Sequence, residues 1–312
     1  MVNSPIAATI PVAPDTFHSG FVAIIGRPNV GKSTLLNQLV GQKIAITSPV
    51  AQTTRNRLQG IVTTATAQLI LVDTPGIHKP HHELGRVLVK NAKRAIHQVD
   101  VVLFLVDSCV PLGRGDQFIA DLLDTTAPPV ILGLNKLDQQ NPQQTEEINQ
   151  SYQTLAAERH WPCLQFSALT GTHLEALQQA ITEQLPHGPY YYPPELVTDQ
   201  PERFIMAELI REQILLKTRQ EVPHSVAIVI EKVEETEKRT NVFAAITVER
   251  PSQKGILIGK SGSMLKAIGQ AAREQIQKLI AGDVFLKLFV KVEPKWRQSR
   301  QQLLEFGYRT DE

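Results

Sequence analysis

The stretch Gly26-Arg27-Pro28-Asn29-Val30-Gly31-Lys32-Ser33 fits the pattern G-x-x-x-x-G-K-[ST] of a phosphate-binding loop. The apolar residues 21–25 before it are typical of a buried strand, and residues 33–40 after it predict a helix that Gly41 ends. In this layout the backbone N–H groups of the loop and the N-terminus of the helix attract phosphate. Lys32 is expected to reach the β- and γ-phosphates, and Ser33 to ligate Mg²⁺.

The composition is that of a globular protein without a strong overall charge. The 312 residues suit one large or two ordinary domains, 42% of them are apolar, and the formal net charge is +1. The two cysteines, Cys109 and Cys163, have no metal-ligand spacing and are typical of a reducing compartment. The chain has no apolar run of roughly 18 residues, which a transmembrane helix would need. Residues 1–19 are expected to form a disordered tail.

Alternating apolar runs and helical patterns predict a doubly wound, mostly parallel α/β sheet over residues 20–186. Further strands are expected at residues 58–62, 67–72, 101–106, 130–134 and 162–166. Helices are expected at residues 83–96 and 116–123, from Pro142 to residue 160, and up to residue 185, where Thr172 and Glu175 predict a capping box at the start. Residues 42–57 are polar and are expected to be a mobile loop.

The segment Asp73-Thr74-Pro75-Gly76 follows the strand at residues 67–72. A carboxylate at the carboxyl end of a buried strand, beside the phosphate loop, is where a second Mg²⁺ contact belongs, so this role is assigned to Asp73. Gly76 can bring its backbone N–H close to a γ-phosphate because it has no side chain. The histidines that follow, His78, His81 and His82, lack partners at ligand spacing, so no metal site is expected there.

A motif for a guanine base follows the strand at residues 130–134, in Asn135-Lys136-Leu137-Asp138. Guanine presents N1–H and a 2-amino group side by side, and one aspartate can accept from both, which predicts Asp138 as the base selector. Asn135 is expected to hold the N7/O6 side of the base and to tie nearby loops together, while the stem of Lys136 covers the base face. The backbone N–H groups of Ser167-Ala168-Leu169 are candidates for binding guanine O6.

The chain beyond residue 186 changes character. Residues 187–201 combine prolines with Tyr190, Tyr191 and Tyr192 and predict a stiff linker. Residues 202–312 then predict an α+β domain with helices at 202–219 and 295–306, strands at 225–231, 242–249 and 284–292, and a helix pair around Gly259-Lys260-Ser261-Gly262, whose second helix ends near residue 280. The order is αββααβ, followed by a last helix.

The Gly259–Gly262 loop is a candidate RNA contact. A G-x-x-G loop between two helices clamps the backbone of about four nucleotides in a KH domain. Residues 250–300 carry eleven Lys or Arg against three Asp or Glu, which favours a phosphate backbone as the partner. The apolar run that includes Leu257 is expected to form a groove for bases. The assigned RNA-binding residues are Gly255, Ile256, Ile258, Gly259, Lys260, Ser261, Gly262 and Lys266.

These motifs resemble the bacterial Era family of ribosome-assembly GTPases with a C-terminal KH domain. Motifs G1 to G5 of such GTPases correspond to residues 26–33, 52–56, 73–76, 135–138 and 167–169. The resemblance implies a P-loop GTPase domain, a type II KH domain, GTP or GDP as the nucleotide, and Mg²⁺. It also implies binding to the 3′ region of 16S ribosomal RNA and a role in assembly of the small (30S) subunit. We expect a cytoplasmic monomer, with peripheral membrane contact as in some members.

The assigned nucleotide-binding residues are Asn29, Val30, Gly31, Lys32, Ser33, Thr34, Asn135, Lys136, Asp138, Ser167, Ala168 and Leu169. Catalysis is assigned to Lys32, Thr54, Asp73 and Gly76, and Mg²⁺ to Ser33, Thr54 and Asp73, with Thr53 as the alternative to Thr54.

One departure from signalling GTPases concerns hydrolysis. Ile77 stands where they carry a water-orienting glutamine, so a low basal rate is expected. In GTPases that resemble this chain, an asparagine at the position of Asn29 helps to hold K⁺ beside the phosphates, which makes K⁺ a candidate cofactor. The alternative is that Asn29 only shapes the turn after Pro28. Arg55 and Arg57 are weaker candidates for an arginine finger.

Two other functions compete with a GTP-controlled RNA switch. A pure RNA-binding module with a vestigial nucleotide site is disfavoured because Lys32, Ser33 and Asp138 are intact. A membrane-associated signalling GTPase with a general RNA-binding role would need an anchor, and the sequence shows no clear lipidation motif or basic amphipathic helix.

Overall fold

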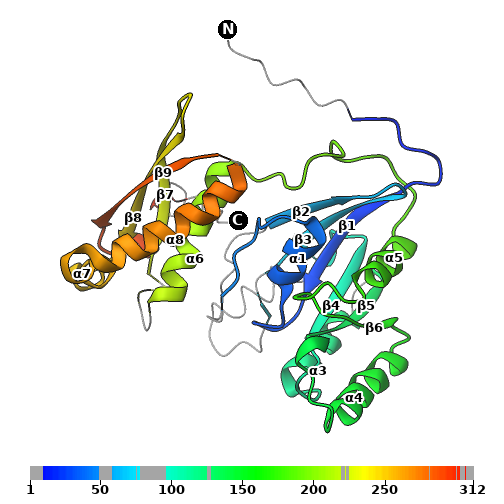
Figure 1. The fold of residues 1–312 in the computed structure, drawn as a ribbon. Coiled ribbons are helices and arrows are strands. Elements are labelled where there is room, and N and C mark those ends of the chain that lie inside the picture. The colour runs from blue at the N-terminus through cyan, green and yellow to red at the C-terminus, as the bar shows by residue number, and fades with distance from the viewer. Residues whose placement is uncertain are drawn as a thin grey trace. The chain divides into compact units, whose positions relative to one another are not determined.

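The computed structural model describes residues 10–48, 58–74, 76–77, 96–124, 128–218, 222, 225–280, 282–299, 301–302 and 306. The chain divides into two compact units (Figure 1). The first comprises Met1–Ile44 with Arg57–Asp199, and the second comprises Ala45–Asn56 with Gln200–Glu312. The expected linker residues up to 199 therefore group with the first unit, and part of the expected mobile loop groups with the second.

The first unit is built on a six-stranded sheet in the order β2-β3-β1-β4-β5-β6. Its strands are β1 His18–Ile25, β2 Leu58–Thr63, β3 Ala67–Asp73, β4 Val101–Asp107, β5 Val130–Asn135 and β6 Cys163–Gln165. All neighbours pair in parallel except β2, which forms an antiparallel hairpin with β3 at the edge. Strands β3 and β5 are buried along their whole length, and β4 is buried up to Val106, because helices cover both faces of a parallel sheet. The predicted doubly wound sheet is confirmed.

The helices of the first unit are α1 Lys32–Val40, α3 Arg114–Leu123, α4 Thr145–Glu158 and α5 Leu174–Gln184. The apolar faces of α3 and α4 share one core with β1, β4 and β5, and α1 and α5 lie on the opposite face (Figure 1). Gly41 ends α1 in the left-handed conformation, with φ of 74°, as predicted. Residues 83–95 of the helix predicted at 83–96 lie outside the described residues, and Ile96 is helical and buried.

Two predicted helix starts are wrong. Helix α5 has no capping box of Thr172 and Glu175, because its N-cap is His173, in the left-handed conformation and without a side-chain cap. The Thr172 hydroxyl lies 2.7 Å from the Thr170 hydroxyl instead. Helix α4 begins at Thr145 rather than at Pro142, because Asn141 first closes a turn in which its side chain accepts the backbone N–H of Gln143. Polar residues just before a helix can either cap the helix or form a separate turn, and the sequence pattern does not distinguish these two arrangements.

The tyrosine segment of the predicted linker is fastened to the first unit by one buried side chain. Gln68 in β3 is fully buried, and its Oε1 accepts the backbone N–H groups of Tyr191 and Tyr192 at 2.8 and 3.0 Å. Its Nε2 donates to the Tyr192 carbonyl at 2.9 Å. The rings of Tyr190 and Phe17 add a contact with centroids 4.3 Å apart. Gln68 thus satisfies backbone groups that the linker could not pair by itself.

Gln68→Ala is expected to lower the free energy of unfolding of the first unit by about 2 kcal/mol, because buried backbone groups lose their partners. Protease cleavage within residues 186–199 should become faster. Urea unfolding and limited proteolysis measure both effects. Gln179→Ala is the matched control, because Gln179 is exposed and its Nε2 donates to Glu183 on its own helix. Equal stability and equal cleavage for the two variants would contradict this role of Gln68.

The second unit has helices α6 Glu202–Lys217, α7 Pro251–Ile258 and α8 Ser263–Ile280, and strands β7 Ala227–Glu235, β8 Thr240–Val248 and β9 Val284–Val292. The sheet order is β7-β8-β9, with β7 antiparallel and β9 parallel to β8. Leu288 of β9 faces Gly269 of α8, so the helices cover one face of the sheet. This is the predicted αββααβ order with the type II pairing. The predicted last helix at residues 295–306 is wrong in its first part, because Lys295 is left-handed, Trp296–Gln298 forms only a short 3-10 helix and Ser299 is extended. Residues 300 and 303–305 of that prediction lie outside the described residues.

Helix α6 carries buried polar side chains, including Glu212, which is fully buried. Its Oε1 accepts the backbone N–H of Thr47 at 2.8 Å, within the second unit. Among the helices that the structure describes, none is long and apolar enough to cross a membrane.

Candidate functional site

The loop at residues 26–31 has the backbone geometry of a phosphate cradle. Asn29 and Gly31 are both left-handed, with φ of 64° and 101°. A side chain at Gly31 would clash with Asn135, because its Cβ would lie 2.2 Å from the Asn135 Nδ2. Lys32 begins α1, and its Nζ donates to the carbonyls of Gly26 and Arg27 at 3.1 and 2.8 Å.

Lys32 is buried, and its surroundings disfavour the charged form. Burial lowers the pKa of the Lys32 ammonium to about 8, and the nearby Asp73 partly offsets this effect. An anionic phosphate at the loop would favour the charged form again. A bound phosphate would therefore supply the negative charge that stabilises the Lys32 ammonium in this site.

Two oxygen-bearing side chains meet beside Lys32. The Ser33 hydroxyl donates to Oδ2 of Asp73 at 2.7 Å, and Asp73 is fully buried at the end of β3. Hydroxyl and carboxylate oxygens suit Mg²⁺, so these residues fit the metal expected from the sequence. Thr54 and its alternative Thr53 lie outside the described residues.

The segment after Asp73 lies against the phosphate loop. A Cβ at Gly76 would come within 2.7 Å of the Pro28 nitrogen, so this close approach requires glycine. The Ile77 N–H donates to the Gly26 carbonyl at 3.1 Å, and the Ile77 side chain is buried in the core between the sheet and α3. Ile77 is therefore directed into the protein and cannot orient a water molecule.

Asn135 joins the phosphate loop to the loop after β6. Its Nδ2 donates to the Val30 carbonyl and its Oδ1 accepts from the Ala168 N–H, both at 2.8 Å. Asp138 accepts from the Ser167 hydroxyl at 2.5 Å. The base-binding segments, which are far apart in sequence, are thus brought together at the carboxyl ends of β5 and β6. Leu169 remains 65% exposed at the rim.

Two residues at this end were not assigned from the sequence. Asp107 forms an ion pair with Lys136 at 2.5 Å, which holds the lysine stem while Lys136 itself is left-handed, with φ of 71°. The Ser108 hydroxyl donates to the Asn135 carbonyl at 2.6 Å. The strand register pairs Asp107 with Asn135. A role for Asp107 at this site could have been predicted, because it directly follows the apolar run at residues 101–106. Its ion pair with Lys136 could not, because the two residues are far apart in the sequence.

The Gly259–Gly262 loop lies between α7 and α8 as predicted. Gly259 and Gly262 have φ of 72° and 80°, and a Cβ at Gly259 would lie 2.7 Å from that of Met264. Lys260 and Lys266 are exposed, and Ile256 is 49% exposed. Leu257 is fully buried, so the expectation that it forms part of a base groove is wrong. It faces the core because only one side of α7 is free.

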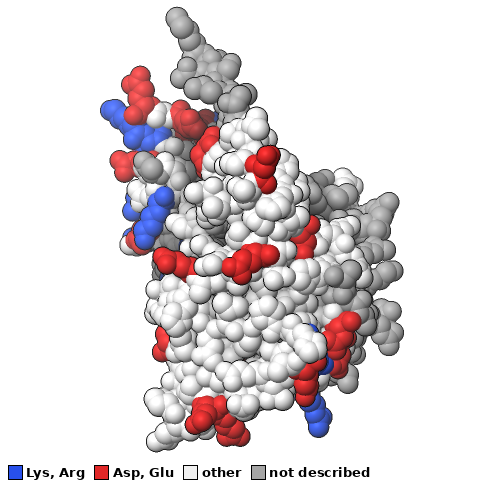
Figure 2. Space-filling model, turned by 90° about the vertical axis from the view of Figure 1, so that its right-hand side faces the viewer, with Lys and Arg blue, Asp and Glu red and all other residues white. Residues whose placement is uncertain are grey.

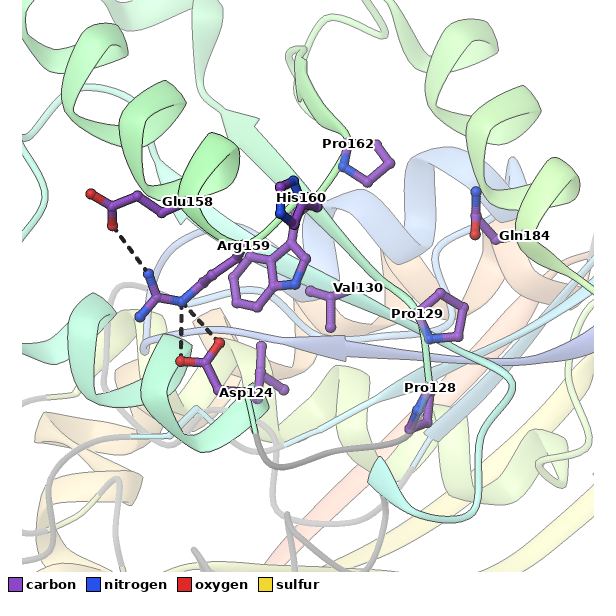
Figure 3. Close-up of a pocket in the computed structure, with 11 residues that line it drawn as sticks. Asp124, Pro128, Pro129, Val130, Glu158, Arg159, His160, Pro162 and Gln184 are labelled. Carbon is purple, nitrogen blue, oxygen red and sulfur yellow. Dashed lines mark hydrogen bonds and ion pairs between the residues drawn. The ribbon is translucent and has the colours of Figure 1, made fainter.

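A cavity of about 760 Å³ lies elsewhere in the first unit (Figure 3). Its lining includes Pro128, Val130, Trp161 and Pro162, and Arg159 spans its wall with an ion pair to Asp124. These residues lie at the amino ends of β5 and β6, whereas the nucleotide-binding segments lie at the carboxyl ends of the strands. The cavity is therefore separate from the predicted nucleotide site.

The α/β sheet, the loop at residues 26–33 and the base motif at Asn135–Asp138 define a P-loop GTPase, here joined to a KH unit. Residues 21–136 match the family described as 50S ribosome-binding GTPase, and residues 221–297 match the KH domain family. The chain is 77% identical over 305 residues to GTPase Era of Synechocystis sp., covering 98% of this chain and 97% of the relative. It is 50% identical over 299 residues to GTPase Era of Leuconostoc citreum, covering 95% and 98%. The chain belongs to the GTPase Era family.

Two solved structures are similar over almost the whole chain. A crystal structure of Era with MgGDPNP and nucleotides 1506–1542 of 16S ribosomal RNA has a TM-score of 0.86 and 36% identity, covering 94% of this chain and 99% of that one. A variant of Aquifex aeolicus Era bound to GDP and AlF₄⁻ has a TM-score of 0.85 at the same identity and coverage. As a member of this family, the chain is a GTPase.

Proposed function

We propose that the protein is a Mg²⁺-dependent GTP switch that binds the 3′ region of 16S ribosomal RNA during assembly of the small ribosomal subunit. The observation that carries this proposal is the similarity to the Era complex with MgGDPNP and that RNA segment, which extends over 94% of the chain. Two features of the structure support the proposal. The nucleotide segments converge at the carboxyl ends of the strands, and the G-x-x-G loop lies between two helices.

In the proposed nucleotide site, Lys32 contacts the β- and γ-phosphates, and Ser33 and Asp73 hold Mg²⁺. The Gly76 N–H approaches the γ-phosphate, and Thr54 is the proposed Mg²⁺ ligand from residues 52–56. Asp138 selects guanine, and Asn135 and Lys136 hold the base. The remaining backbone contacts are assigned to Asn29, Val30, Gly31, Thr34, Ser167, Ala168 and Leu169. The proposed boundaries are 20–186 for the GTPase domain and 202–312 for the KH domain.

The charge distribution supports RNA as the partner of the second unit. Among the described residues that Figure 2 shows, Lys and Arg side chains are few, and Asp and Glu side chains are scattered over that face. The sequence from 250 to 300 has eleven Lys or Arg against three Asp or Glu. On α8, Lys266, Arg273 and Lys278 are all exposed. Exposed cations along a helix that begins at a glycine loop suit a phosphate backbone.

Hydrolysis needs a group that replaces the missing glutamine. We propose that Asn29 ligates K⁺ beside the phosphates, where the cation would offset the charge that builds between the β- and γ-phosphates. The left-handed φ of Asn29 suits a pure turn role as well, so its side chain must be tested directly.

In the proposed role the protein is a cytoplasmic monomer. Liposome flotation without RNA tests whether it also makes the peripheral membrane contact expected from some members of the family.

Crosslinking and sequencing of bound RNA is expected to recover the 3′ end of 16S ribosomal RNA, with a yield that depends on whether GTP or GDP is bound. Replacing both central loop residues, in Lys260→Asp/Ser261→Asp, should weaken RNA binding about tenfold at matched salt, because carboxylates repel phosphate. GTP affinity should not change. Lys238→Asp/Thr236→Asp, on the exposed β7–β8 turn, makes the same change in net charge and is the matched control. Equal RNA affinity for the loop variant and wild type would rule out the proposed RNA contact at Gly259–Gly262.

A further inference from the structure

The turn at residues 27–30 of the phosphate loop is held by groups from three other segments. The Val30 carbonyl accepts from Asn135, and Pro28 packs against Gly76. The third contact comes from α3, where Oδ1 of Asp116 accepts from Nε of Arg27 at 2.8 Å. The first two contacts involve motifs already assigned to the nucleotide site. The third contact joins the loop to a helix that has no assigned role.

Asp116 is fixed from several sides. It is the third residue of α3 and is fully buried. Its Oδ2 accepts from the Gly113 N–H at 3.3 Å and from the Tyr152 hydroxyl at 3.4 Å. Burial raises the pKa of Tyr152, and the negative charge of Asp116 adds to the effect, so the hydroxyl keeps its proton and donates. These hydrogen bonds hold the Asp116 carboxylate in one orientation, in which Oδ1 faces Nε of Arg27.

Arg27 has little freedom to move away from this carboxylate. A Cβ at Gly115 would lie 2.8 Å from Cδ of Arg27, which shows how closely the arginine stem crosses α3. The side chain of Arg27 is 31% exposed and that of Asp116 is fully buried. Removing one partner of such a pair leaves a charge with poor access to water, which costs more than breaking a surface pair.

Arg27 also contacts Lys32, which is proposed to bind the β- and γ-phosphates. The Arg27 carbonyl accepts from Nζ of Lys32 at 2.8 Å. One residue thus links a buried carboxylate on α3 to the lysine and, two positions along the chain, to Asn29. A shift of the turn would move both groups relative to the phosphates.

We propose that Asp116 is a positioning residue for GTP hydrolysis, which acts through Arg27 and is itself oriented by Tyr152. The proposal rests on the assignment of residues 26–33 as the phosphate loop. Catalysis by positioned groups is sensitive to small displacements, since a misplacement of about 1 Å can cost on the order of a hundredfold in rate. GDP binding is shared among Lys32, the helix N-terminus and the base contacts, none of which uses the side chain of Arg27 or Asp116, whereas hydrolysis depends on their exact placement. Hydrolysis should therefore suffer more than binding.

The test compares Asp116→Asn, Arg27→Gln and the double variant by single-turnover GTP hydrolysis and by GDP affinity. Each single variant is expected to hydrolyse GTP about tenfold more slowly, with the GDP Kd within about threefold of wild type. The double variant should be no slower than the slower single variant, because both changes break one interaction. Asp121→Asn is the matched control on the same helix, since Asp121 is 60% exposed and pairs with Arg159. It should match wild type.

Hydrolysis rates within twofold of wild type for both single variants, or losses that multiply in the double variant, would overturn the proposal. If Asp116→Asn does not fold, Arg27→Gln decides alone, because its side chain is partly exposed. Lys32→Ala is measured in parallel. Unchanged GDP affinity in that variant would refute the phosphate-loop assignment, a result that the Asp116 variants do not affect.

Discussion

Asp138→Asn is expected to move the base preference from GTP towards xanthosine triphosphate by about a hundredfold or more. An aspartate accepts from guanine N1–H and from the 2-amino group, whereas an asparagine must donate at one of these positions. Xanthine offers an oxygen in place of the amino group, which suits the amide. The Ser167 hydroxyl, 2.5 Å from Oδ1 of Asp138, holds the carboxylate in place for this contact.

Competition binding of GTP, ATP and xanthosine triphosphate measures the change. The wild-type protein should reject ATP, because adenine lacks the donor pair. Asp124→Asn is the control, since Asp124 pairs with Arg159 at the opposite end of the strands, and its base preference should equal that of wild type. Equal affinity of the wild-type protein for ATP and GTP would show that Asn135 and Asp138 do not read the base.

Replacing K⁺ by Na⁺ at constant ionic strength is expected to slow single-turnover GTP hydrolysis about tenfold to a hundredfold. The reason is weaker stabilisation of the charge that develops in the transition state, an effect expected to be smaller than the roughly hundredfold to thousandfold loss seen when a single stabilising donor is removed. The buried side chain of Ile77 leaves this role open to another group. The amide oxygen of Asn29 is a suitable hard ligand for the ion.

Asn29→Gly separates the two roles of this residue, because glycine keeps the left-handed turn and removes the amide oxygen. It should hydrolyse GTP slowly in both salts. Asn29→Asp retains an oxygen ligand and should keep a K⁺ preference. Identical wild-type rates in K⁺ and Na⁺ would leave Asn29 as a turn residue. A K⁺ preference that survives in Asn29→Gly would place the ion on other ligands.

Residue patterns within short segments were enough to predict the fold of both units. The apolar run predicted at residues 101–106 is strand β4, Val101–Asp107, and the strand predicted at residues 284–292 is β9. A strand buried on both faces, such as β4, needs continuous apolar residues, so its position shows in the sequence. Most residues of β9 are exposed or half-buried, and its position shows instead in its valine and phenylalanine content. Helix starts were less secure, as Thr145 and His173 show, because polar residues near a helix can cap it or form a separate turn.

The sequence by itself determined the GTPase and KH classes, because glycine, lysine and aspartate at fixed spacing are required by phosphate, metal and base chemistry. Only the tertiary structure decided how these segments are held. Lys136 meets Asp107 across 29 residues, Arg27 meets Asp116 across 89, and Gln68 meets the Tyr192 carbonyl across 124. Such pairs cannot be recognised from the local periodicity or composition of the sequence, since each side chain is of a common polar type. Their selection depends on strand order and helix packing, which bring distant residues within hydrogen-bonding distance.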